Sequence, residues 1–154
     1  MSAIVTLKNL TVSYNRHPAI HHINGRFAAG SLTAIAGANG AGKSSLLKAI
    51  VGINQIESGE VVIEGATQNE IGYLPQVVEV ERDFPLTIKQ MVATGFWNKI
   101  GAYKKITKQM QDEAEQAIEA VGLSGVCDKS IASLSSGQFQ RAMFARLLVQ
   151  NAKL

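Results

Sequence analysis

The sequence predicts an α/β fold in which a β-rich first half carries a phosphate-binding loop and the second half is helical. Three observations support this class. Residues 1–76 contain short runs of apolar and β-branched residues separated by turn formers. A glycine-rich segment at 37–44 joins one such run to a helical pattern. Residues 77–150 instead show apolar residues at helical spacing and two pairs with capping-box spacing.

Composition sets limits on the class of protein. A chain of 154 residues, 46% hydrophobic and 18% charged, suits one globular domain and excludes a disordered chain. The net charge of +3 is too small to indicate nucleic-acid binding, so we expect no nucleic-acid partner. A single cysteine, Cys127, excludes an internal disulfide framework and favours a reducing compartment. With no signal-like start and no apolar run of about 18 residues, we expect a soluble, cytoplasmic protein.

The β-rich half is expected to contain short strands separated by turns at His17–Pro18, Gly30–Ser31 and Ser58–Gly59. The run Leu32–Ala36 does not alternate, which predicts a strand buried on both faces. A helix is expected over 45–51, ended by Gly52. The expected strands lie at 3–14 (as one or two strands), 19–28, 32–36, 61–63 and 71–74.

The second half is expected to contain helices at 87–94, 107–121 and 139–149. Thr87 with Gln90, and Ser135 with Gln138, have the spacing of capping boxes. The second helix has one apolar face made of Met110, Ala114, Ala117, Ile118 and Val121, and the third has Met143, Leu147 and Leu148 as apolar positions.

The segment between 37 and 44 fits the phosphate-loop pattern G-x-x-x-x-G-K-[ST]. Its glycines allow the backbone to wrap around a polyphosphate, and the helix that Ser45 continues offers its N-terminal dipole to the same anion. The lysine supplies a charge for the β- and γ-phosphates, and the serine hydroxyl is a Mg²⁺ ligand. The alternative is a glycine-rich turn with an incidental lysine. The candidate nucleotide-binding residues of this segment are Gly37, Ala38, Asn39, Gly40, Ala41, Gly42, Lys43, Ser44 and Ser45.

A second candidate anion site lies at Leu134–Gln138. Ser135, Ser136, Gly137 and Gln138 by themselves read as an ordinary helix N-terminus. A capped helix start with serine and glycine also suits an anion. One nucleotide occupies one loop, so two such sites in one chain require an explanation.

Taken together, these segments resemble the nucleotide-binding domain of ABC transporters, in which a P-loop, a glutamine loop and an L-S-G-G-Q signature follow in that order. Here they are Gly37–Ser44, Leu74–Gln76 and Leu134–Gln138, and Ser136 replaces the first signature glycine. The resemblance implies an ABC-type P-loop NTPase core over 1–154. It further implies an antiparallel β subdomain, with the P-loop and glutamine loop, over about 1–76, and a helical signature subdomain over about 77–150.

The resemblance also implies roles for single residues, with ATP and Mg²⁺ as cofactors. Tyr14 would stack on adenine, Lys43 would act on the phosphates, and Ser44 and Gln76 would contact Mg²⁺. Ser135 through Gln138 would contact the ATP held by a second domain in a head-to-tail homodimer. The simpler alternatives are that Tyr14 is an ordinary strand aromatic and Gln76 a polar residue after a turn-forming proline.

The family's catalytic Asp-Glu pair and a later histidine have no counterpart in the sequence. Glu64 follows an apolar run but precedes Gln76, the wrong order for the family, and is interpreted as a surface or turn residue. His17, His21 and His22 are interpreted as solvated positions rather than metal ligands. We therefore expect the family's ATPase activity to need residues beyond Leu154, and this stretch alone not to hydrolyse ATP.

The stretch from Gln76 to Gly95, with Phe84-Pro85-Leu86-Thr87 and Met91–Gly95 within it, resembles the importers of zinc, manganese or chelated iron. That resemblance implies import powered by ATP on the cytoplasmic face of the membrane, with permease subunits and, indirectly, a substrate-binding protein as partners. Phe84, Phe96 and Trp97 would contact a partner helix or pack in a core. Lys99, Lys104, Lys105 and Lys108 would face lipid headgroups or form a solvated helix face, the simpler interpretation.

Three alternatives to a transport ATPase remain open. One is a non-transport protein of the same ABC type, a nucleotide-dependent binding protein or scaffold. Another is a piece that binds ATP without hydrolysing it. The third is an unrelated P-loop kinase, which would explain Gly37–Ser44 but leave Leu134–Gln138 to coincidence.

Overall fold

The computed structural model describes residues 3–14, 17–67, 70–75, 84–101 and 104–154. The chain divides into two compact units. One contains residues 1–71 with 153–154, and the other contains residues 72–152. Each unit has a hydrophobic core of its own. The predicted α/β class is confirmed, because an antiparallel sheet and a set of helices make up the structure.

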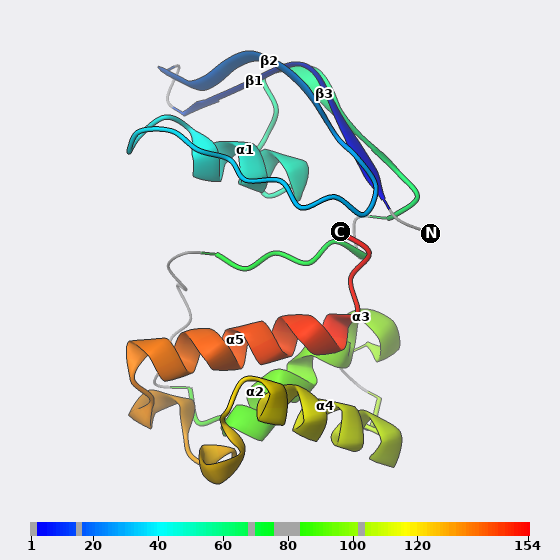
Figure 1. Ribbon diagram of the computed structural model, residues 1–154, viewed down its shortest axis with the longest axis vertical. Helices are drawn as coiled ribbons and strands as arrows, with labels where there is room; N and C mark the ends of the chain where they lie inside the picture. The colour runs from blue at the N-terminus through cyan, green and yellow to red at the C-terminus, as the bar shows by residue number, and fades with distance from the viewer. Residues whose placement is uncertain (1–2, 15–16, 68–69, 76–83, 102–103) are drawn as a thin grey trace. The chain divides into compact units, whose positions relative to one another are not determined.

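The first unit is a three-stranded sheet with one helix against it (Figure 1). The strands β1 (Ile4–Tyr14), β2 (His17–Phe27) and β3 (Ser58–Glu64) lie in the order β2-β1-β3, and both pairings are antiparallel. Helix α1 (Lys43–Ile50) contributes Ala49 and Ile50 to the core. These meet inward-facing residues of the sheet, among them Val5, Leu7, Leu10, Val12 and Ile20.

The second unit is helical. Its elements are α2 (Ile88–Ala93), the 3₁₀ turn η2 (Thr94–Phe96), α3 (Trp97–Ile100), α4 (Lys108–Ala120), the 3₁₀ turns η3 (Ser124–Val126) and η4 (Ile131–Ser133), and α5 (Ser136–Gln150). Phe96 and Phe139 are the largest of its fully buried side chains. The predicted apolar face of α4 is confirmed: Ala114, Ala117 and Ile118 are buried, with Met110 and Val121 partly buried against the same core.

Two predicted strands are wrong. Leu32–Ala36 and Ile71–Leu74 have no strand structure, and the Leu32 side chain is fully exposed. A strand needs a neighbouring strand to take up its backbone hydrogen bonds. Within the described part of the chain, neither segment has such a neighbour.

Two local predictions also need correction. His17 and Pro18 were expected in a turn but are the first residues of β2, where His17 pairs with Tyr14. Ser58 and Gly59 likewise belong to β3. On α5, Met143 is buried in the core, whereas Leu148 is 45% exposed. In the described residues, no helix is long and apolar enough to cross a membrane.

Candidate functional site

The glycine-rich segment forms an exposed loop that leads into α1, and Lys43 folds back over it. The Lys43 ammonium donates to the carbonyl oxygens of Gly37 at 2.8 Å and Ala38 at 2.7 Å. The loop backbone therefore curls around the lysine, and the charge lies beside the peptide groups that would surround a phosphate. These two hydrogen bonds join the two ends of the predicted loop 37–44.

Only glycine fits at position 42, the N-cap of α1. Its φ is +83°, a left-handed conformation that strains other residues. A Cβ there would lie 2.3 Å from the carbonyl oxygen of Ala19 and 2.5 Å from the Cγ2 of Ile20. Gly42 thus lets the start of α1 lie directly against β2, which fixes where the helix N-terminus points.

The N-terminus of α1 differs from that of the other longer helices. Thr87, Thr107 and Ser135 cap α2, α4 and α5 with their side chains. Within the described residues α1 has no side-chain cap and no acidic residue in its first turn. Its first N–H groups, next to Lys43 and the exposed Ser44, are therefore available to an anion.

Tyr14, at the end of β1, is connected to the same helix. Its hydroxyl accepts a hydrogen bond of 2.6 Å from the Asn54 side chain, which also donates to the carbonyl of Ser45 at 3.3 Å. The tyrosine side chain is 47% exposed. Sequence reasoning missed Asn54; its only signal is a polar residue just after the glycine stop of α1.

The signature residues form the start of α5. Ser135 and Gln138 make a complete capping box, which confirms the predicted pairing. The Ser135 hydroxyl accepts from the Gln138 N–H at 3.2 Å, and the Gln138 side chain accepts from the Ser135 N–H at 3.0 Å. A hydroxyl that accepts through its oxygen still has its proton to donate, so Ser135 retains a donor for a ligand.

Gly137 has no evident structural reason to be glycine. A Cβ placed on it meets no atom within 4 Å among the described residues, and its φ lies outside the left-handed region. Ser136 beside it is exposed. The two small residues leave the start of α5 uncovered, which permits close approach of a ligand or another chain.

The site residues fall in two separate units. Tyr14 and the loop belong to the first unit, and Ser135–Gln138 belong to the second. Gln76, the predicted glutamine-loop residue, lies outside the described residues.

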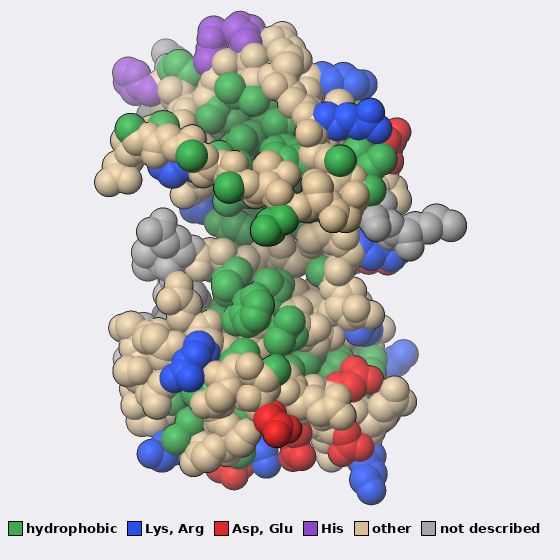
Figure 2. Space-filling model, viewed as in Figure 1, with side chains coloured by type: hydrophobic (Ala, Val, Ile, Leu, Met, Phe, Trp, Pro, Cys, Tyr) green, Lys and Arg blue, Asp and Glu red, His purple; other side chains and the backbone are tan. Residues whose placement is uncertain are grey.

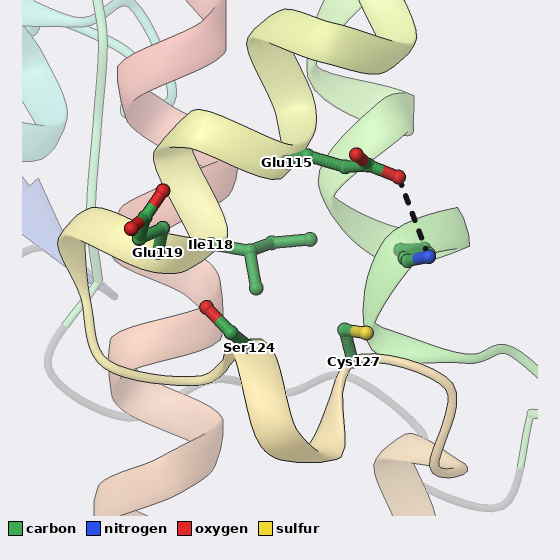
Figure 3. Close-up of a pocket in the computed structure, with 6 residues that line it drawn as sticks. Glu115, Ile118, Glu119, Ser124 and Cys127 are labelled. Atoms are coloured by element: carbon green, nitrogen blue, oxygen red, sulfur yellow. Dashed lines mark ion pairs between the residues drawn. The ribbon is translucent and has the colours of Figure 1, made fainter.

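A cavity of about 250 Å³ lies in the helical unit and is lined by other residues, among them Lys89, Glu115 and Cys127 (Figure 3). Lys89 lies within ion-pair distance of Glu115, at 3.4 Å, and Asp128, at 3.6 Å. The hydrogen bond with Glu115 is the main reason that the pKa of Lys89 is raised. The lysine is already neutralised, so this cavity does not suit an anion. No metal-binding cluster of three or more ligands occurs among the described residues.

A family model, related sequences and solved structures all match this chain to one family. The family model described as ABC transporter matches residues 20–154. The zinc transport system ATP-binding protein TroB of Treponema pallidum is 39% identical over 97% of this chain and 58% of its own length. The manganese transport system ATP-binding protein MntB of Listeria monocytogenes is 37% identical over 96% of this chain and 63% of its own.

A solved structure agrees with these relatives. That structure is cbiO1 from Clostridium perfringens, part of the ABC transporter complex cbiONQ. It matches with a TM-score of 0.76 and 25% identity, over 99% of this chain and 63% of its own. The chain therefore spans about three fifths of the length of the relatives it matches.

Proposed function

Because the chain belongs to the ABC transporter family, we propose that it is the nucleotide-binding part of a subunit that binds and hydrolyses ATP to drive transport. The observation that carries the proposal is the P-loop geometry. Lys43 is held against two loop carbonyls, beside a helix N-terminus that has no side-chain cap among the described residues. Three features that favour a polyphosphate meet there: a cation, free N–H groups and a helix dipole.

ABC ATPase domains bind ATP, and Mg²⁺ is general for such nucleotide hydrolases. In the proposed complex, Lys43 contacts the β- and γ-phosphates, and the Ser44 hydroxyl and the Gln76 side chain are Mg²⁺ ligands. The backbone from Gly37 to Gly42 surrounds the phosphates. Tyr14 stacks on the adenine ring, with its hydroxyl held by Asn54. The bound Mg²⁺ would supply charge neutralisation at the transferred phosphoryl group.

The second anion site is explained by a second copy of the domain. We assign Ser135, Ser136, Gly137 and Gln138 to the ATP held in the loop of a partner copy, in a head-to-tail dimer. The free proton of Ser135 and the uncovered Gly137 support this assignment, since both suit a phosphate that approaches from outside the unit. ATP would then stabilise the closed dimer by its higher affinity for that state.

The relatives suggest what is transported. TroB carries the name of a zinc transport system and MntB that of a manganese transport system. We propose a divalent metal ion as cargo, imported through a membrane permease to which this subunit binds on the cytoplasmic face. A substrate-binding protein would deliver the ion to that permease.

Binding of Mg·ATP to the full-length protein tests the nucleotide site. We expect Lys43→Ala to weaken the affinity, measured by calorimetry, at least about tenfold, since it removes a charge-assisted contact. Lys48→Ala is the matched control: it removes the same type of side chain four residues after Ser44, in the last turn of the same helix. Full affinity in Lys43→Ala would overturn the proposal.

The transport step needs the assembled transporter. With permease and substrate-binding protein in vesicles, we expect zinc or manganese uptake to depend on internal ATP and to be lost with Lys43→Ala. If the complex hydrolyses ATP but takes up neither ion, the proposed cargo is wrong. The proposed nucleotide site would be unaffected by that result.

A further inference from the structure

The basic residues of the chain are unevenly distributed. The stretch 84–111 contains five lysines and no acidic residue. The rest of the chain holds ten basic and twelve acidic residues, so it is slightly acidic although the whole chain has a net charge of +3. A charge excess confined to one stretch indicates a local anionic partner rather than general solubility.

Two of the five lysines are used within the helical unit. Lys89 lies between Glu115 and Asp128. Lys99 donates to the carbonyl of Val149 at 3.4 Å, and its ammonium lies 5.8 Å from the centre of the Phe96 ring.

The other three lysines, Lys104, Lys105 and Lys108, are exposed and have no ion pair or hydrogen bond from their side chains within the described residues. Acidic residues are close along the chain, since Asp112 and Glu113 lie one turn further on α4. Neither forms an ion pair with these lysines in the described part of the chain, and Glu113 accepts a hydrogen bond from Gln109 at 3.2 Å.

Lys108 also lies where a helix disfavours a cation. It is the first residue of α4, and no acidic residue occupies the first turn. Thr107 caps this end with a neutral hydroxyl, so the positive end of the helix dipole adds to the charge of Lys108. An anion bound at this end of α4 would relieve that repulsion.

Two apolar residues close to the lysines in the sequence are anchored in the helical unit. Ile100 and Ile106 pack against its core. Trp97, at the start of α3, is 48% exposed. Figure 1 shows α3 and the N-terminal end of α4 at the same end of the helical unit, and Figure 2 shows Lys or Arg side chains, with Asp or Glu side chains between them, along that edge.

We propose that this basic surface, defined as Trp97, Lys104, Lys105 and Lys108, binds the anionic phospholipid headgroups of the membrane. The inference rests on the proposed function, which brings the subunit to a membrane permease. Lysines near an anionic bilayer each strengthen binding about fivefold, so three contribute on the order of 100-fold. Tryptophan suits the same place, because its ring settles at the level of the headgroups. A nucleic acid is disfavoured by the small patch and the acidic remainder of the chain.

Vesicle sedimentation of the full-length protein tests the surface. The probes are vesicles of neutral phosphatidylcholine, and vesicles in which about a third of the lipid is phosphatidylglycerol. We expect binding to the anionic vesicles only, weakening as salt is raised. The variant K104Q/K105Q/K108Q should lose on the order of 100-fold in partition.

The control variant K8Q/R26Q/K129Q also removes three positive charges, but from other parts of the chain. Its binding to anionic vesicles should weaken much less. If vesicle binding weakens equally in the two variants, it depends only on the net charge of the protein, and the proposal is overturned. Equal binding to both vesicle types would also overturn it, as would complete displacement by a short DNA duplex at equal phosphate concentration. Mg·ATP affinity is measured on the same samples. If it persists while vesicle binding fails, only this inference falls; if it is absent, the proposed nucleotide site fails separately.

Discussion

At position 42 the backbone conformation and the neighbouring strand β2 together decide which residue is allowed. Gly42 has φ +83°, and a Cβ would meet the Ala19 carbonyl oxygen at 2.3 Å. Gly40 has the same φ, but a Cβ there meets nothing within 4 Å among the described residues. We expect Gly42→Ala to lower the free energy of unfolding by about 2–4 kcal/mol and Gly40→Ala by about 1 kcal/mol. Urea denaturation of both variants measures the difference; equal losses would mean that the close approach to β2 contributes nothing.

Glu70 is the residue whose charge depends most clearly on its neighbours. Its carboxylate accepts from Lys153 at 2.7 Å and from the Thr67 N–H at 2.9 Å, and chiefly the lysine hydrogen bond lowers its pKa from 4.5 to about 2. A lowered folded-state pKa stabilises the fold above about pH 4.5, and that contribution is lost as the pH falls towards 2. We expect NMR titration to show the low value, and Lys153→Gln to raise it. An unchanged pKa in Lys153→Gln would assign the shift to Thr67 instead.

At the scale of the element, substitutions at the start of α5 can distinguish effects on stability from effects on function. Replacing a helical glycine with alanine stabilises by about 0.5–1 kcal/mol, and Gly137 has free space for the added methyl. We therefore expect Gly137→Ala to fold at least as stably as the original in thermal unfolding. ATP-dependent dimerisation, measured by light scattering, should nevertheless weaken if the second copy approaches there. Normal dimerisation would remove Gly137 from the proposed interface.

Substitutions of Ser135, the N-cap of α5, should change stability as well as function. Ser135→Ala removes the acceptor for the Gln138 N–H and should cost about 1 kcal/mol of unfolding free energy. Ser135→Asp keeps an acceptor at the cap, so its stability should be restored, while its added negative charge would repel a phosphate. A variant with restored stability and full ATP-dependent dimerisation would show that Ser135 acts only as a cap.

For the whole molecule, the two units are expected to respond separately to changes in their cores. Leu10 is buried in the core of the first unit and Phe139 in that of the second. Truncation to alanine should cost about 2–5 kcal/mol for Leu10 and about 3–5 kcal/mol for Phe139. Hydrogen exchange should then show lost protection mainly in β1–β3 for Leu10→Ala and in α2–α5 for Phe139→Ala. Loss of protection spread evenly over both units would mean that they unfold as one.

The local sequence was enough for features that neighbouring residues decide among themselves. Both capping boxes, the apolar face of α4 and the helix after the glycine-rich loop agree with prediction. Each depends on partners a few residues away. The predicted site residues could be identified as a set by their order and spacing, although their roles stay predictions.

Tertiary structure decided what depends on partners distant in the chain. The runs at 32–36 and 71–74 have strand-like composition but no strand beside them among the described residues, so composition alone misled. Asn54 gains its contacts to Tyr14 and Ser45 only when β1 and α1 pack together. The sequence by itself determined the α/β class, the phosphate loop and the helix starts, because these are encoded in consecutive residues. The packing of α1 against β2 at Gly42, and the unpaired state of three lysines, were decided by the fold, because they depend on which distant groups come close.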